Sequence, residues 1–92
     1  MNYYLTCINH EQNRHRFYSI AVQDGLFGNF YLIRHWGRIG TNGRTLSQGF
    51  DTLEEVENQI DRLIQIRKRH GYSLRSSTEV KEMVKPKEKK RQ

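Results

Sequence analysis

The spacing of the hydrophobic residues changes once, a little past the middle of the chain. Upstream of this change, short runs of aromatic and β-branched residues alternate with turn-forming residues, which is typical of β-strands. Downstream of it, apolar residues recur every three or four positions, which predicts an amphipathic helix. The sequence therefore predicts an α+β fold, a small antiparallel sheet with one long helix on one face. The helical stripe consists of Leu53, Val56, Ile60, Leu63 and Ile64.

Short connections join the predicted strands. Asp24-Gly25 begins a turn, Asn42-Gly43 is a strong hairpin motif, and residues 9–15 form a polar loop. Because every connection is short, an antiparallel meander of four strands is the economical arrangement. The four predicted strands are residues 3–8, 16–23, 29–38 and 44–50.

Both ends of the predicted helix carry residues that helix termini prefer. Asp51 or Thr52 can accept a hydrogen bond from the first free backbone amides, and two glutamates follow in the first turn. Residues 67–70 are cationic or histidine, which suits the carbonyls of the last turn, and Gly71 is the expected stop. The apolar stripe is expected to cover one face of the sheet, which leaves the other face and the strand ends for a ligand.

The composition changes after Tyr72. We therefore divide the chain into a domain, residues 1–72, and a basic tail, residues 73–92. The tail has seven basic and three acidic residues, which gives it a net charge of +4. A short helix is predicted at residues 77–84, and the nearly all-charged segment beyond Pro86 is expected to be disordered.

The compartment is predicted from what the chain lacks. Cys7 is the single cysteine and cannot form an internal disulfide, which favours a reducing compartment. No apolar run is long enough for a transmembrane helix, and the N-terminus lacks the features of a signal peptide. We expect a cytoplasmic protein, nucleoid-associated if the source is bacterial, with no membrane partner.

One segment brings the only tryptophan together with two arginines. Trp36 lies between Arg34 and Arg38 at the end of a predicted strand. Gly37 has no Cβ atom, so a ligand can approach the backbone closely there. Strand alternation puts Leu32, Arg34 and Trp36 on one face, where a cation beside a flat ring suits a sugar, a base or a phosphate. A place in the hydrophobic core is the alternative for the indole.

The charge of the predicted domain is unevenly distributed. Residues 1–72 contain nine basic and seven acidic residues, and five of the acids lie around the helix start. The remainder of the domain is therefore cationic, as expected of a protein that binds a polyanion, although basic surfaces also serve solubility alone. The five acids are Asp51, Glu54, Glu55, Glu57 and Asp61.

The segment Trp36-Gly37-Arg38, followed by Ile39-Gly40, resembles the signature of the WGR domain, a module of DNA-dependent poly(ADP-ribose) polymerases and of stand-alone bacterial proteins. Further landmarks occur in the family's order and cover roughly residues 3–72. They are the strand at 15–20, the hairpin turn at 41–44, the helix start at 50–55 and the ending from Lys68 to Gly71-Tyr72.

The resemblance implies roles for individual residues. In the polymerases the matching tryptophan stacks on the sugar of a terminal nucleotide at a DNA end, which implies the same role for Trp36. Arg38 is implied to contact phosphates or a neighbouring protein domain. Arg16 matches a lysine of the family and is a candidate phosphate contact, whereas His15 stands where many members have asparagine. Arg44 follows the hairpin turn near Arg38, and converging guanidinium groups favour a phosphate between them.

The sequence gives little support for catalysis or metal binding by this domain. Cys7 and His10 are three positions apart, but the other histidines lack zinc-site spacing. No carboxylate pair stands beside a nucleophile, and no Walker-type phosphate loop is present. We therefore expect no enzyme activity, no cofactor, no metal and no small-molecule substrate.

The predicted function is nucleic-acid binding, at DNA ends or nicks and with little sequence preference. Tryptophan stacking and arginine–phosphate contacts would supply the affinity. Three alternatives remain: a protein-interaction module acting in trans on a DNA repair or modification partner, an RNA binder, and an accessory protein without a strong ligand. The candidate nucleic-acid-binding residues are His15, Arg16, Arg34, Trp36, Gly37, Arg38 and Arg44.

Overall fold

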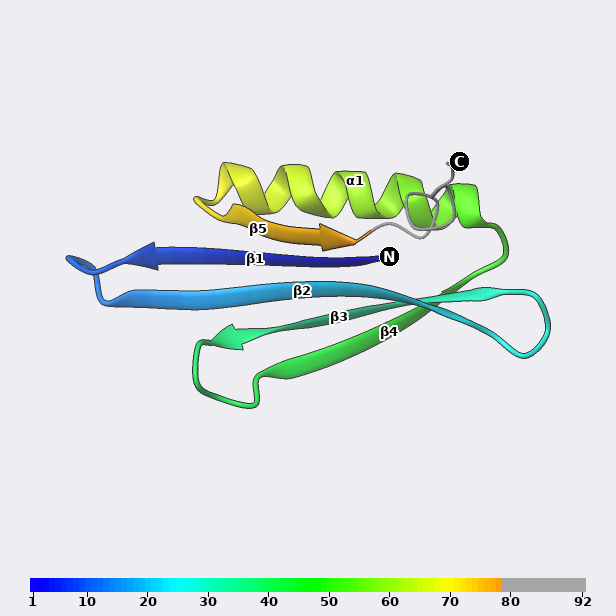
Figure 1. Ribbon diagram of the computed structural model, residues 1–92, viewed down its shortest axis with the longest axis horizontal. Coiled ribbons are helices and arrows are strands. Elements are labelled where there is room, and N and C mark those ends of the chain that lie inside the picture. Colours follow the sequence, from blue (N-terminus) through cyan, green and yellow to red (C-terminus); the bar gives the residue numbers. More distant parts are fainter. Residues whose placement is uncertain (79–92) are drawn as a thin grey trace, which may run out of the picture.

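The computed structural model describes residues 1–78, which form an antiparallel sheet with one helix packed on it (Figure 1). The predicted α+β class is confirmed, and the sheet has five strands rather than four in the order β4-β3-β2-β1-β5. The elements are β1 (Asn2–Asn9), β2 (Arg14–Asp24), β3 (Phe30–Arg38), β4 (Arg44–Phe50), α1 (Leu53–Arg69) and β5 (Ser73–Thr78).

The additional strand, β5, lies beyond the predicted domain boundary and pairs antiparallel with β1. All six of its residues are exposed, so it carries no alternation of apolar and polar residues that would have predicted a strand. Its place is set by backbone pairing with β1. Ser77 and Thr78, the first residues of the predicted short helix, therefore belong to a strand, and the rest of that helix lies outside the described residues.

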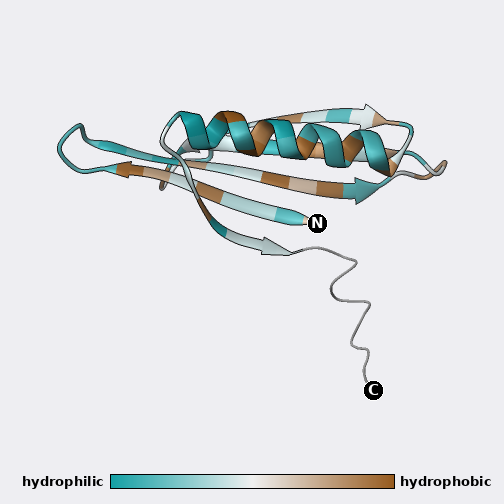
Figure 2. Ribbon diagram, turned by 90° about the horizontal axis from the view of Figure 1, so that it is seen from above, coloured by the Kyte–Doolittle hydropathy of each residue, from teal (hydrophilic) through white to brown (hydrophobic). Residues whose placement is uncertain are grey.

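The hydrophobic core lies between α1 and one face of the sheet. The helix is amphipathic, and Figure 2 shows hydrophobic and hydrophilic residues alternating along it. Apolar side chains on alternate positions of β1, β2 and β3 meet the helical stripe, as the period of each element requires. The core consists of Tyr3, Leu5, Tyr18, Ile20 and Leu32 from the sheet and Val56, Ile60 and Leu63 from the helix.

The helix ends match the prediction closely. Thr52 is the N-cap, and its hydroxyl oxygen accepts a hydrogen bond from the Glu55 backbone amide at 3.2 Å. The Glu55 carboxylate in turn accepts from the Thr52 amide at 3.2 Å, which completes a capping box. At the other end, Gly71 has φ +92°, the left-handed conformation that stops a helix. Within residues 1–78, α1 is neither long nor apolar enough to cross a membrane.

We expect Thr52→Ala to lower the free energy of unfolding by about 1 kcal/mol, because the Glu55 amide loses its acceptor. Thr52→Ser keeps the hydroxyl oxygen and is the matched control, with a free energy of unfolding close to that of the wild type. Urea denaturation followed by circular dichroism measures both. Equal stability of the alanine and serine variants would show that the cap contributes nothing.

Candidate nucleic-acid interface

The register of the sheet places most of the predicted site residues on one face. Trp36 of β3 lies opposite Tyr18 of β2 and Arg44 of β4, and Arg38 lies opposite Arg16. Opposite residues of antiparallel strands share a face, and alternation adds Arg34 to it. Arg16, Arg34, Trp36, Arg38 and Arg44 therefore lie on one surface, which we call the arginine–tryptophan surface.

The indole of Trp36 lies between the two alternatives that the sequence left, a ligand contact and a place in the hydrophobic core. It lies on the helix-bearing face, is half-buried, and packs against the hydrophobic core. Its ring centroid lies 6.0 Å from that of Tyr18, with an angle of 31° between the planes. The sequence of β3 alone does not determine on which side of the sheet α1 docks. The strand pattern therefore predicted which residues share a face with Trp36, but not that the helix and the core partly bury this face.

The open part of this surface lies over β4. Six of the seven residues of β4 are exposed, and Leu46, on the same face as Trp36, is 45% exposed. The helix therefore covers the inner strands and leaves the β4 side of Trp36 and Arg44 accessible. In Figure 1 the last turn of α1 lies at the same end of the molecule as the end of β3, far from the acidic helix start.

Arg67 belongs to this surface and was not among the predicted site residues. Its guanidinium carbon lies 4.8 Å from the Tyr18 ring centroid and 5.7 Å from that of Tyr72, within cation–π range. The stripe could have indicated it, since Arg67 follows Leu63 by four positions. A cation in the last turn instead suggested only a favourable contact with helix carbonyls.

Two arginines of this surface have an unpartnered nitrogen. The Nε atoms of Arg34 and Arg67 are buried and have no hydrogen-bond partner within residues 1–78. A buried donor without an acceptor costs free energy. A cation that packs on aromatic rings keeps its charge and can still attract an anion. The surface therefore concentrates positive charge beside aromatic rings.

Arg38 has a structural partner of its own. It donates hydrogen bonds to the backbone carbonyl and the side-chain oxygen of Asn13, both at 3.1 Å. Asn13 lies in the β1–β2 turn with φ +54°. The two hydrogen bonds therefore connect that turn to the end of β3. Its partner is thus Asn13, through the backbone carbonyl and the side-chain amide.

His15 and Gly37 lie on the opposite face. His15 is opposite Ile8, and its ring centroid is 5.1 Å from that of His10. A Cβ atom on Gly37 would lie 2.8 Å from the Cα atom of Gly43, so the β3–β4 loop fills the space that a ligand was expected to use. The structure therefore does not bring His15 and Gly37 together with the arginine–tryptophan surface.

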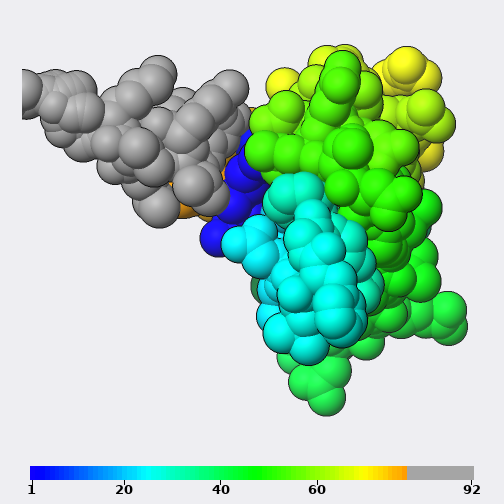
Figure 3. Space-filling model, turned by 90° about the vertical axis from the view of Figure 1, so that its right-hand side faces the viewer, coloured from blue at the N-terminus to red at the C-terminus, as the bar shows by residue number. Residues whose placement is uncertain are grey.

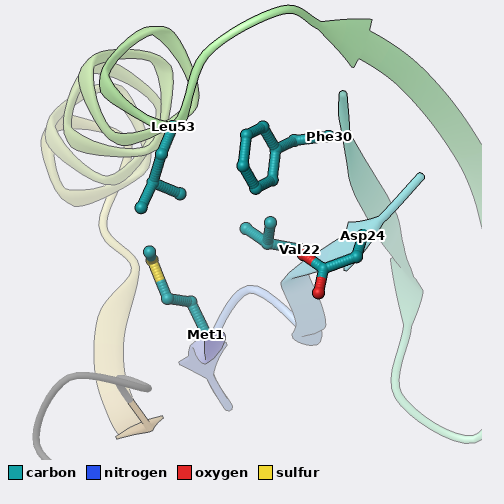
Figure 4. Close-up of a pocket in the computed structure, with 5 residues that line it drawn as sticks. All are labelled: Met1, Val22, Asp24, Phe30 and Leu53. Carbon is teal, nitrogen blue, oxygen red and sulfur yellow. The ribbon is translucent and has the colours of Figure 1, made fainter. Parts of the chain in front are cut away.

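Among residues 1–78, hollows lie at the other end of the sheet. One, of about 220 Å³, is lined by Met1, Val22, Asp24, Phe30 and Leu53, whose apolar side chains point toward one another (Figure 4). The other, of about 470 Å³, lies between Tyr31 and the β2–β3 hairpin. Figure 3 faces this end, with the hairpin in cyan. Both hollows are distant in register from Trp36.

The chain matches the model of the WGR domain over residues 1–79. It is also 31% identical over 74 residues to a relative from Sinorhizobium fredii (strain NBRC 101917 / NGR234) named "uncharacterized protein y4dW". That alignment covers 80% of this chain and 36% of the relative, so the chain spans little more than a third of the relative's length. The chain therefore belongs to the WGR domain family, a family of nucleic-acid-binding modules, and Trp36 and Arg38 of its signature lie on the arginine–tryptophan surface.

Proposed function

We propose that this domain binds ends or nicks in DNA with little sequence preference, through the arginine–tryptophan surface, and that it acts by binding rather than by catalysis. The observation that carries the proposal is the register of β2, β3 and β4, which sets Trp36 among four arginines on one face. Phosphates would contact the guanidinium groups, and the sugar of a terminal nucleotide would stack on the indole.

Like charges that face each other across strands support an anionic ligand. Arg16 and Arg38 are directly opposite, and an anion between them would offset the repulsion of the like charges. Arg44 extends the same cationic region along β4. Because phosphates repeat along a nucleic acid, one strand end can neutralise several of these groups at once.

Partial burial of Trp36 supports stacking rather than opposing it. The contact with Tyr18 and the core holds the indole in one orientation before a ligand arrives. A ring that is already fixed loses less conformational entropy on binding than a mobile one. Within residues 1–78 the one helix, α1, is basic only in its last turn and begins with acidic residues, which a major groove would repel, so base-specific recognition is not expected.

The test is a titration of short labelled duplexes with the full chain. Trp36→Ala should weaken binding about 5- to 150-fold, the range expected for one lost stacking contact. Because Trp36 also packs against the core, Trp36→Phe, which keeps a flat ring, should retain most of the affinity and most of the stability. Covalently closed circular DNA should compete poorly.

A charge series separates the surface from net charge. Arg44→Gln should reduce the dependence of log K on log salt by about one phosphate contact. Arg62→Gln, on an exposed part of α1, removes the same charge elsewhere and should leave that slope almost unchanged. End binding through this surface is ruled out if both variants behave alike and Trp36→Ala binds as tightly as the wild type.

A further inference from the structure

The face of the sheet opposite the helix carries a second set of aromatic side chains. Tyr4 and Tyr31 are 39% and 40% exposed there, on β1 and β3. None of the strand positions on this face within residues 1–78 is an aspartate or a glutamate. A broad surface without carboxylates is electrostatically compatible with a polyanion, which would be repelled at the acidic start of the helix.

The exposed tyrosines rest on ordered neighbours. The Tyr4 ring stacks on Phe17, with centroids 6.4 Å apart and 16° between the planes. Phe17 is only 7% exposed and makes a T-shaped contact with His35, with ring centroids 5.0 Å apart. Tyr31 lies against Gly49, where an added Cβ would be 3.4 Å from the ring. Each phenol is therefore held with part of its surface toward solvent.

Arg75 brings a cation to the same face. Its Nε atom donates a 2.7 Å hydrogen bond to the hydroxyl of Thr6, a nearly buried residue of β1. A register shift in the β1–β5 pairing between Tyr4 and Leu5 lets β5 present this side chain there. Neither terminal nitrogen of Arg75 has a hydrogen-bond partner within residues 1–78, so both can donate to a phosphate.

The spacing suits an extended ligand. Ser19 is opposite Tyr4 and Gln23 is opposite Tyr31, so the tyrosines are four residues apart along the strands and two strands apart across the sheet. With ordinary strand geometry this separation is roughly 16 Å. The distance is too long for one base and fits a strand of several nucleotides.

We propose that this face binds a single strand of nucleic acid, whose bases stack on Tyr4 and Tyr31 while Arg75 contacts its backbone. The proposal rests on the proposed function, because the strand would be one that leaves the DNA end held at Trp36. Continuity supports it: the β3–β4 loop leads from Arg38 to Arg44 on one face, and its Asn42 carbonyl accepts a hydrogen bond from Nε2 of His35 on the other.

The test compares a blunt duplex, the same duplex with a ten-nucleotide overhang, and the free single strand as DNA and as RNA. We expect the wild type to bind the overhang duplex more tightly than the blunt one. Tyr31→Ala should remove at least about fivefold of affinity for the overhang and the single strand. It should leave blunt-duplex affinity unchanged, whereas Tyr31→Phe keeps the ring and should bind like the wild type.

Tyr4→Ala is a second variant on the other strand, with thermal unfolding as its folding control because Tyr4 packs on Phe17. Overhang and single-strand affinities that stay at wild-type level in both alanine variants overturn the proposal. So does a wild-type dimer that Tyr31→Ala dissociates without a change in nucleic-acid affinity, because the face would then bind a second copy.

If the wild type binds single strands through the tyrosines but no duplex, this proposal holds and end binding through Trp36 fails. Tighter binding of RNA than of DNA would support single-strand binding by this face, with RNA as its ligand.

Discussion

Leu32→Ala should destabilise the domain by about 2–5 kcal/mol, the cost of removing a buried leucine and leaving a cavity. Leu32 lies on β3 between β2 and β4 and has no exposed surface, in contact with the core beneath the helix. A domain of this size has a total stability of about 4–14 kcal/mol. The substitution therefore removes a large share of the stability, and urea denaturation should show a much lower midpoint.

Leu46→Ala is the matched control, since it makes the same chemical change on the neighbouring strand of the same face. Leu46 is 45% exposed, so its loss should cost well under half as much as that of Leu32. Similar losses from the two variants would show that α1 covers β4 as fully as β3 in solution, and that the exposed surface beside Trp36 and Arg44 does not exist.

The contrast between these leucines shows what the sequence could predict and what it could not. Alternation along β3 correctly grouped Leu32, Arg34 and Trp36 on one face, because the period of a strand is a local property. Burial of that face depends on where α1 docks, which is decided by the whole domain. The sequence therefore predicted the membership of the arginine–tryptophan surface better than the exposure of its indole.

The helix was predictable because several independent features agreed. Its stripe, its N-cap and its glycine stop all pointed to the same boundaries. β5 was missed because Leu74 is its only apolar residue, so its position follows from the free edge of β1 and not from its own sequence. A strand that forms mainly through backbone pairing with a neighbouring strand has no periodic pattern of apolar residues in its own sequence.

Contacts across turns were the least predictable. Arg38 meets Asn13 only because the β1–β2 turn folds against the end of β3, 25 residues later in the chain. The Asn42-Gly43 motif did mark a hairpin, but the turn is longer than two residues. It begins with a tight turn from Arg38 to Thr41, in which the Thr41 amide donates to the Arg38 carbonyl at 3.0 Å.

Gly43→Ala should damage both the fold of this hairpin and binding at the arginine–tryptophan surface. Gly43 has φ +69°, and a Cβ atom there would overlap the carbonyl oxygen of Trp36 and lie 3.1 Å from the Phe17 ring. Backbone strain alone costs about 1–3 kcal/mol, and relief of the overlap requires the loop to move. Since Arg44 is the next residue, we expect a loss of DNA affinity alongside the loss of stability.

Gly40→Ala separates the two causes. Gly40 has φ +94°, further from the region that alanine tolerates, but a Cβ atom there meets no atom within 4 Å. A larger stability loss at Gly43 must therefore come from the overlap with β3, because strain would favour the opposite order. Urea denaturation followed by the fluorescence of Trp36, the only tryptophan, measures both variants. If Gly40→Ala is the more damaging, the loop is not packed against Trp36 and Phe17 as the structure shows, and Arg44 is not fixed by it.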